Sequence, residues 1–331
     1  MTRVLILWCS CMLTQSCALL SSLSLERECN YHRHGGDRTN CYSDPWVDEV
    51  RAEDLGHGFI SIDVGCNTGI NSAVWLAKFG GNPDVARGWS EGLKTAKAPR
   101  GACRENFQNK MSRVVAVLER DGRAAGHLAA PRAICVEPMP ANINLISTVK
   151  AQVLAANGLE VVHAAASNIT GTASFPVGGS GQENLGLSSG VVPTERAEDV
   201  QVDVITIDKL VEDRNLDHVD VLTIDTEGHD PAALQGARKT LREKGVGLLV
   251  FEVHQDIKGT PWSHTTLFSV VEELASLHFD CYWARYDGHL KRLTDCWNAE
   301  REEKFSPIGW SNVACARYES HWHRAFEKYV V

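Results

Sequence analysis

The sequence has no excess of basic residues, no repeats and no cysteine spacing typical of a zinc site. Its 33 Lys and Arg residues against 42 Asp and Glu residues give a formal net charge of −9, and the pI is about 5.8. This balance repels phosphate backbones and argues against a nucleic-acid partner. No CxxC pair or histidine-rich run indicates structural zinc. No internal repeat or low-complexity tract suggests a repeat architecture.

Long hydrophobic runs are scarce too, and the one that opens the chain is short for a membrane span. Arg3 precedes an apolar run over residues 4–13, and the small residues Ser16, Cys17 and Ala18 follow. This pattern predicts a signal peptide over residues 1–22, or an uncleaved signal anchor that reaches to about residue 25. We therefore expect a lumenal protein of the secretory pathway (ER or Golgi) or a secreted protein, with no membrane insertion beyond such an anchor.

The cysteines fit an oxidising compartment. Of 11 cysteines, three lie in the leader and eight remain, which is an even number. Cys66 in a glycine turn and Cys135 in an apolar strand are expected to be free and buried. The other six allow three disulfides, and the local pairings to try first are Cys29 with Cys41 and Cys281 with Cys296. A glycosylation sequon at residues 168–170 has meaning only in the same compartment.

The length and composition fit one large α/β domain with additions. The chain has 331 residues, 44% hydrophobic and 23% charged, which is ordinary for a globular protein. Strand-like and helical segments alternate, which predicts a mostly parallel, Rossmann-like sheet with helices on both faces. We predict an N-terminal extension over residues 23–56, a domain over 57–320 with an insertion at about 80–131 and a cysteine-bearing part at about 278–320, and a tail over 321–331.

A strand, a glycine turn and a helix follow one another at residues 59–79. The apolar run FISIDV ends in GCNTG, residues 65–69, and a helical pattern follows. Gly65 and Gly69 let the backbone approach a ligand. The turn lacks the GxGxxG spacing of a dinucleotide site, and Asn67 stands where a glycine would admit phosphate. Asp63 is costly to bury without a cation or donor, and it suits the ammonium group of a methionine moiety, as in S-adenosyl-L-methionine.

Acidic residues follow several other predicted strands. Ligands of open α/β sheets bind at the carboxyl ends of the strands. Glu137 ends the second strand, where a carboxylate grips a ribose diol, although it could instead act as a helix cap. Further candidates at strand ends are Asp225, Glu227, His229, Glu252 and His254.

Five motifs together resemble the FkbM-type S-adenosylmethionine-dependent methyltransferases. They are DVGCNTG at 63–69, VEPMPANINLI at 136–146, AAASNITGTASF at 164–175, VDVLTIDTEGHDPAALQGA at 219–237 and LLVFEVH at 248–254. The resemblance implies a seven-stranded class I methyltransferase sheet and O-methylation of a hydroxyl on a glycan or small molecule. It implies cofactor contacts by Asp63, Gly65, Asn67, Gly69, Glu137 and Ser167. This chain departs from the family at Thr223, where relatives usually have lysine.

Methyl transfer to a hydroxyl needs alignment and a proton acceptor. The candidates for the catalytic groups are Asp225, Glu227 and His254, with Asp225 or His254 as the base and His229 as a further candidate. A divalent metal on Asp225, Glu227 and His254 is conceivable from the ligand types, but the spacing is not diagnostic, and no metal is assigned. The rival functions are a non-catalytic cofactor- or carbohydrate-binding protein with the same fold and, third, an NAD-dependent oxidoreductase, which the turn disfavours.

Overall fold

The computed structural model describes residues 39–99, 103–121, 130–182, 185–187, 199–254, 259–297 and 310–331. The chain divides into two compact units, Met1–His34 and Gly35–Val331, and every element below belongs to the second. The predicted leader and Cys29 lie outside the described residues. Among the helices in the described part of the chain, none is both long and apolar enough to cross a lipid bilayer.

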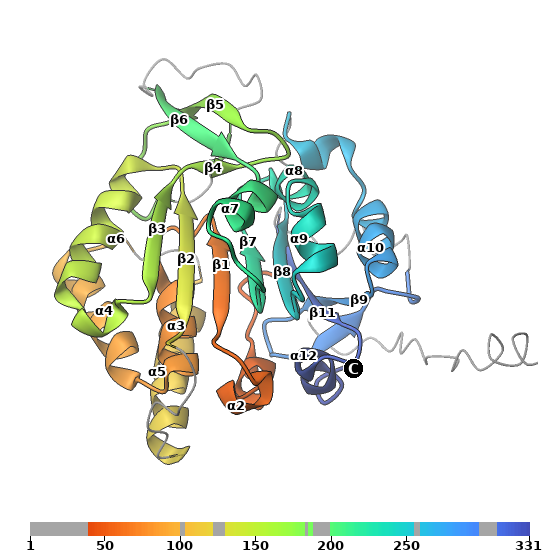
Figure 1. The fold of residues 1–331 in the computed structure, drawn as a ribbon, viewed down its shortest axis with the longest axis horizontal. Coiled ribbons are helices and arrows are strands. Elements are labelled where there is room, and N and C mark those ends of the chain that lie inside the picture. The colour runs from red at the N-terminus through yellow and green to blue at the C-terminus, as the bar shows by residue number, and fades with distance from the viewer. Residues whose placement is uncertain are drawn as a thin grey trace, which may run out of the picture. The chain divides into compact units, whose positions relative to one another are not determined.

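An eight-stranded sheet forms the centre of the Gly35–Val331 unit, in the order β10-β9-β11-β8-β7-β1-β2-β3 (Figure 1). The strands β3, β2, β1, β7 and β8 are parallel, whereas β11 is antiparallel to both of its neighbours and β10 is antiparallel to β9. The predicted mostly parallel sheet is therefore confirmed, with β10 as an added edge strand. The bounds are β1 Ile60–Val64, β2 Arg132–Glu137, β3 Leu159–His163, β7 Val221–Ile224, β8 Leu248–Val253, β9 Phe279–Ala284, β10 Leu290–Arg292 and β11 Ser311–Arg317.

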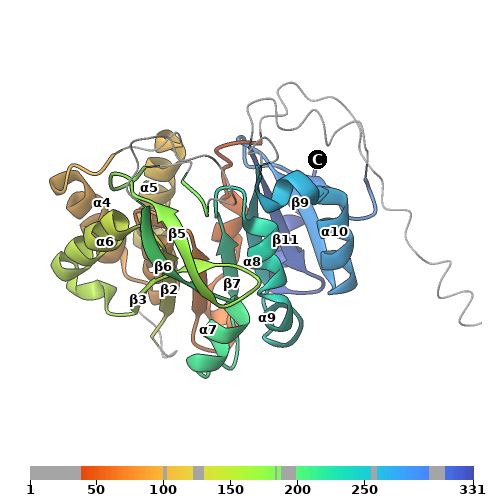
Figure 2. The ribbon, with the colours of Figure 1, turned by 90° about the horizontal axis from the view of Figure 1, so that it is seen from above.

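Helices cover both faces of this sheet (Figures 1 and 2). One face carries α3 Ile70–Gly80, α4 Pro83–Thr95, α5 Arg104–Asp121 and α6 Pro140–Gln152, with the short α2 Ala52–Leu55, α12 His321–Phe326 and the 3-10 helix η1 Pro45–Glu49 nearby. The other face carries α7 Ile207–Asp213, α8 Asp230–Gln235, α9 Arg238–Glu243 and α10 Leu267–Ser276. Two further 3-10 helices are η2 Leu154–Ala156 and η3 Pro261–His264.

A small three-stranded sheet stands beside the carboxyl ends of the parallel strands, at the top of Figure 1. It has the order β4-β6-β5, from Ala165–Ala166 (β4), Asp199–Ile205 (β6) and Gly171–Pro176 (β5). Its buried residues pack with Met139, which precedes α6. The small sheet thus closes one side of the edge at which ligands bind in this fold.

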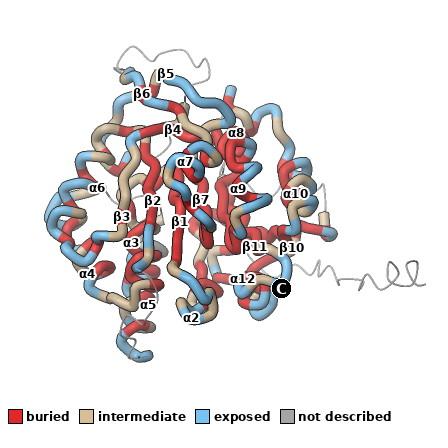
Figure 3. Tube along the Cα trace, viewed as in Figure 1, coloured by how far each residue is buried: buried red, intermediate tan, exposed pale blue. Residues whose placement is uncertain are grey.

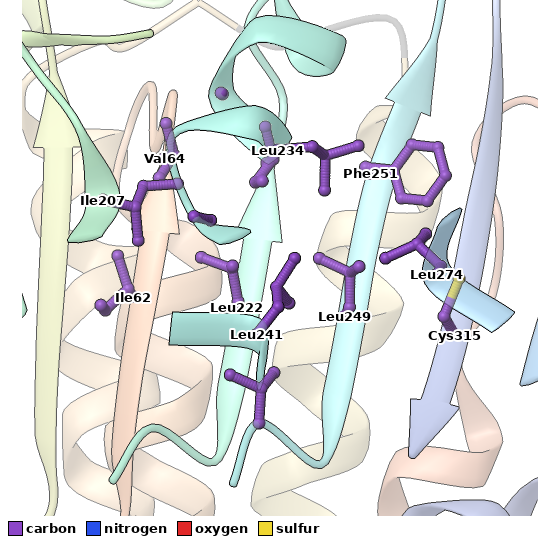
Figure 4. Packing of buried hydrophobic residues seen from close by; sticks show 14 of the residues in the cluster. Ile62, Val64, Ile207, Leu222, Leu234, Leu241, Leu249, Phe251, Leu274 and Cys315 are labelled. Carbon is purple, nitrogen blue, oxygen red and sulfur yellow. The ribbon is translucent and has the colours of Figure 1, made fainter. Parts of the chain in front are cut away.

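Side-chain alternation along the strands separates an apolar core from the polar site. Ile62 and Val64 of β1 pack with Leu222, Leu249 and Phe251 under the α7–α10 layer, as Figure 4 shows, and the central strands are almost entirely buried (Figure 3). Each such side chain contributes roughly 1.5–3 kcal/mol by burial. The alternate residues point to the opposite face. That face carries the carboxylates described below.

Some expected elements differ in the structure. The described residues of the expected insertion at 80–131 form two helices, α4 and α5, whereas the apolar periodicity of residues 104–120 predicts only α5. The pattern of residues 231–243 predicts one helix, whereas the structure has two, α8 and α9, divided around Gly236 and Ala237. The elements β10 and α12 were also not predicted.

The disulfides differ from the predicted pairings. Cys41 pairs with Cys103 and Cys281 with Cys315, so the expected partners Cys29 and Cys296 are wrong. Cys66 and Cys135, expected to be free, form a disulfide with each other. The reason is the register: Asp63 lies opposite Cys135, and the turn carries Cys66 back toward that strand, where the Cys66 N–H donates to Val136 O at 3.4 Å. Cys281 and Cys315 are likewise cross-strand neighbours.

Candidate active site

A cavity of about 810 Å³ opens at the carboxyl ends of β1, β2, β7 and β8. The parallel strands bring the end of each one to the same edge of the sheet. Most of the predicted site residues therefore meet here, although they come from distant parts of the sequence. Those that line the cavity are Asp63, Gly65, Asn67, Glu137, Asp225, Glu227 and His254.

The turn after β1 is held close to its neighbours by backbone contacts. The Gly65 N–H donates to Val136 O at 2.8 Å. Gly65 has φ +72°, and a Cβ on it would lie 1.7 Å from the carbonyl oxygen of Asp225, so only glycine fits there. Asn67 also has a positive φ, of 50°. Its Oδ1 is buried and accepts no hydrogen bond from the described residues, which leaves an acceptor for a ligand.

Asp63 is buried at 2% exposure and its orientation is set by two hydroxyls. Oδ2 accepts a hydrogen bond from Ser72 Oγ at 2.9 Å, and Oδ1 accepts one from Thr223 Oγ1 at 2.5 Å. Burial raises the pKa of Asp63, while the hydroxyls of Thr223 and Ser72 oppose this by favouring the ionised form. Thr223 and Ser72 thus orient this carboxylate.

Glu137 is connected to the same turn. Its Oε2 accepts a hydrogen bond from the Asn67 N–H at 2.8 Å. Its Oε1 accepts from the Met139 N–H at 2.9 Å and from Asn142 Nδ2 at 3.2 Å. Burial raises the pKa of Glu137 to about 7 despite these donors. Oε1 thus accepts two hydrogen bonds, whereas Oε2 accepts one and retains a lone pair that can accept from a ligand hydroxyl.

The ends of β7 and β8 form an acidic side of the cavity. Asp225 follows β7, and the exposed part of its side chain lines the cavity. Withdrawal from bulk water, followed by repulsion from Glu252 and Glu227, raises its pKa well above the usual value. His254 Nδ1 lies 3.5 Å from Glu252 Oε2 and 3.6 Å from Glu227 Oε2. Burial lowers the pKa of His229 to about 4, so its imidazole is neutral at pH 7.

Another wall of the cavity comes from parts of the chain in which the sequence showed no chemistry. Lys110 and Arg113 of α5 both bind the buried carboxylate of Asp44, with Lys110 Nζ at 2.6 Å. Burial alone would raise the pKa of Asp44, but these two cations outweigh it and lower that pKa to about 2. The Cys41–Cys103 disulfide joins the same two segments. The only available signals were the helical periodicity of α5 and the unassigned Cys103.

Two predicted cofactor contacts are not brought to the cavity. Gly69 lies at the N-cap of α3 with φ +73°, and a Cβ there would lie 2.7 Å from the Trp89 ring. It therefore shapes the turn without lining the cavity. Ser167 is only partly buried, and its hydroxyl donates to Asn168 Oδ1 at 3.3 Å, near the small sheet. Asn168 itself is exposed and donates to Gln235.

Comparisons with known proteins give two kinds of match, to solved structures and to a family model. Two solved structures are similar: the methyltransferase FkbM from Methylobacillus flagellatus, with 13% identity and a TM-score of 0.40, and the precorrin-6y C5,15-methyltransferase from Geobacter metallireducens, with 11% identity and a TM-score of 0.32. The first match covers 83% of this chain and 48% of that one, so this chain spans about half its length, and the second covers 82% and 86%. No curated protein matches the sequence significantly. The model of the methyltransferase FkbM domain matches residues 101–280, more than half of the chain. The chain therefore belongs to the FkbM family of S-adenosylmethionine-dependent methyltransferases.

Proposed function

We propose that this methyltransferase transfers a methyl group to a hydroxyl of a glycan or a small hydroxylated molecule in the secretory pathway. The proposal rests on one observation. The turn after β1, which suits the cofactor, and the acidic residues at the ends of β7 and β8 line the same cavity. The three described disulfides support an oxidising compartment.

The residues of the turn fit S-adenosylmethionine. Glu137 Oε2 retains acceptor capacity for a ribose hydroxyl, and Asn67 Oδ1 is a buried acceptor that a ligand donor can satisfy. Asp63 supplies a negative charge for the amino group of the methionine moiety. When bound, the cofactor supplies an electrophilic methyl group on a sulfonium.

Asp225 is our candidate for the group that accepts the proton of the acceptor hydroxyl. It is exposed to the cavity, and its backbone oxygen directly borders the cofactor turn at Gly65. A base must lie within hydrogen-bond reach of the hydroxyl that receives the methyl group. His254 is only 7% exposed and faces the carboxylates of Glu252 and Glu227. We therefore assign the role of general base, which accepts the proton, to a carboxylate oxygen of Asp225. His254 and Glu227 have a supporting role.

Calorimetry and a labelled methyl donor test this function. The folded protein is expected to bind S-adenosylmethionine and to label at least one member of a panel of glycans and small alcohols. Asp225→Asn is expected to retain binding and to lose about 100-fold or more in turnover, the lower end for a general base. Asp217→Asn, an exposed change before the start of β7, is the matched control. Absence of cofactor binding by folded protein would refute the proposal, and binding without transfer to any acceptor would favour a non-catalytic binding protein.

A further inference from the structure

Three side chains that can bind a metal converge at the ends of β7 and β8. Glu227 lies in the turn after β7, Glu252 lies near the end of β8, and His254 follows that strand. Since β7 and β8 are adjacent and parallel, their ends meet. One ligand atom from each of the three residues lies within 4.8 Å of the others. All three residues line the cavity.

The distances suit a shared central ion. His254 Nδ1 is 3.5 Å from Glu252 Oε2 and 3.6 Å from Glu227 Oε2. Two ligand atoms that are each about 2.1 Å from a tetrahedral metal lie about 3.4 Å apart. Direct hydrogen bonds between these atoms would normally be near 2.9 Å. The distances from His254 Nδ1 to the two carboxylate oxygens therefore match those between ligands of a shared ion better than those of direct hydrogen bonds.

The burial and the hydrogen bonding of the His254 side chain are a second observation. The residue is 7% exposed, and Nδ1 makes no hydrogen bond with the described residues although two carboxylates face it. Buried polar atoms normally have a hydrogen-bond partner, and this ring nitrogen lacks one among the described residues. A metal ion would occupy its lone pair.

The charges at this side of the cavity also favour a bound cation. The like-charged carboxylates of Asp225, Glu227 and Glu252 all line this side of the cavity, where they repel one another. The cations Lys110 and Arg113, on the α5 wall, are bound to Asp44. A divalent cation would offset a repulsion that is costly in a partly enclosed site.

A second cluster shows why the first one is preferred. His57, His218 and Asp220 also lie close enough to hold an ion. There, however, His218 Nε2 is hydrogen-bonded to Gly58 O at 2.7 Å, and Asp220 Oδ2 accepts from the Ile60 N–H at 2.8 Å. The backbone thus already hydrogen-bonds to a ring nitrogen of His218 and to a carboxylate oxygen of Asp220 that a metal would need. This cluster lies at the amino ends of the strands, away from the cavity, and serves as a control.

We propose that Glu227, Glu252 and His254 bind a divalent cation of the Mn²⁺ or Zn²⁺ type at the acceptor side of the cavity. Two carboxylates and one imidazole suit these ions, and three protein ligands leave coordination positions open. Because all three ligand residues line the cavity, an oxygen of the acceptor would be able to complete the coordination. The role toward the acceptor rests on the proposed methyl transfer to a hydroxyl, but binding of the ion does not. The sequence assigned no metal, and the metal set it considered contained Asp225 in place of Glu252.

Metal titration of the chelator-treated full chain tests the site. Mn²⁺ binding is followed by electron paramagnetic resonance of the free ion, and Zn²⁺ binding by equilibrium dialysis. We expect one site per chain, weakened at least tenfold in Glu252→Gln and in His254→Gln, and unchanged in the control variant His57→Gln. Calorimetry with S-adenosylmethionine verifies that each variant is folded, since none of these residues lies in the cofactor turn.

Two outcomes would overturn the metal site. One is that neither ion binds to chain that still binds S-adenosylmethionine, which leaves the proposed methyl transfer standing. The other is that Glu252→Gln and His254→Gln bind the ion as the unmodified chain does, or that His57→Gln abolishes binding. Conversely, stoichiometric ion binding without methylation of any acceptor supports the site and counts against the proposed function.

Discussion

Replacing Gly65 with alanine tests whether the cofactor turn and the β7 turn are packed as one unit. Gly65 has φ +72°, and an added Cβ would lie 1.7 Å from the carbonyl oxygen of Asp225 and 2.8 Å from its carbonyl carbon. Both are backbone atoms, so no side-chain rotation relieves the clash. Either the turn after β1 or the residues after β7 must move.

The expected magnitude follows from comparison with Gly56. Gly56 has the same φ of +72°, and a Cβ there has no atom within 4 Å. Alanine costs roughly 1–2 kcal/mol at either position because of the left-handed backbone. Overpacking adds about 1–3 kcal/mol at Gly65 alone. We therefore expect Gly65→Ala to lower the free energy of unfolding by about 2–5 kcal/mol and Gly56→Ala by about 1–2 kcal/mol.

Urea unfolding and calorimetry measure the two consequences. Gly65→Ala should show the larger loss of stability and at least about tenfold weaker binding of S-adenosylmethionine, which corresponds to 1.4 kcal/mol. Gly56→Ala should bind the cofactor normally. Equal stability losses in the two variants, together with unchanged cofactor affinity in Gly65→Ala, would show that the two turns are not in the contact described.

Three further predictions concern the cavity walls. Cofactor affinity should rise as the pH rises through about 7, because ribose hydroxyls donate best to ionised Glu137, and calorimetry on Glu137→Gln should show no such rise. Asp44, whose pKa falls from 3.8 to about 2 on folding, stabilises the folded state above pH 4; about 2 kcal/mol should be lost as the pH falls to 2, and Asp44→Asn should lack that component in acid titrations. Loss of the Cys41–Cys103 disulfide, which spans 62 residues, should cost about 4 kcal/mol in urea unfolding of the double serine variant; a loss below about 1 kcal/mol would contradict this.

Local sequence patterns were sufficient for the parallel strands of the large sheet and for the glycine turn after β1. The run FISIDV and its glycine turn predict β1 and the start of α3 because apolar runs and glycines act locally. The helix α4 was missed because Gly88 and Gly92 are poor helix formers. In the structure these glycines allow α4 to pack closely against α6. A Cβ on Gly88 would lie 3.1 Å from Val153, and one on Gly92 would lie 2.7 Å from Val149. That advantage exists only once both helices are packed.

Disulfide pairing was beyond local reasoning for the same reason. Cys41 and Cys103 are separated by 62 residues and meet only because α5 packs beside the segment that contains Asp44. The proposed metal cluster could be recognised only in part from the sequence. Glu252 and His254 are two residues apart, which places them on one face of a strand. Their position beside Glu227 depends on the pairing of β7 with β8, which is a property of the whole sheet.

The structure also separates the acids of the DTEGHD motif, which the sequence could not do. Asp230 is fully buried, and its Oδ1 accepts a hydrogen bond from the Glu252 backbone N–H at 3.3 Å, so it ties the β7 turn to β8. Glu227 has φ +52° and precedes Gly228 at φ +100°, and this unusual backbone directs the turn toward the cavity. Asp230 therefore holds the turn, and Asp225 and Glu227 are the acids left for chemistry. It follows that Asp230→Asn should act first on stability and on the position of Glu252, whereas Asp225→Asn should act on turnover alone.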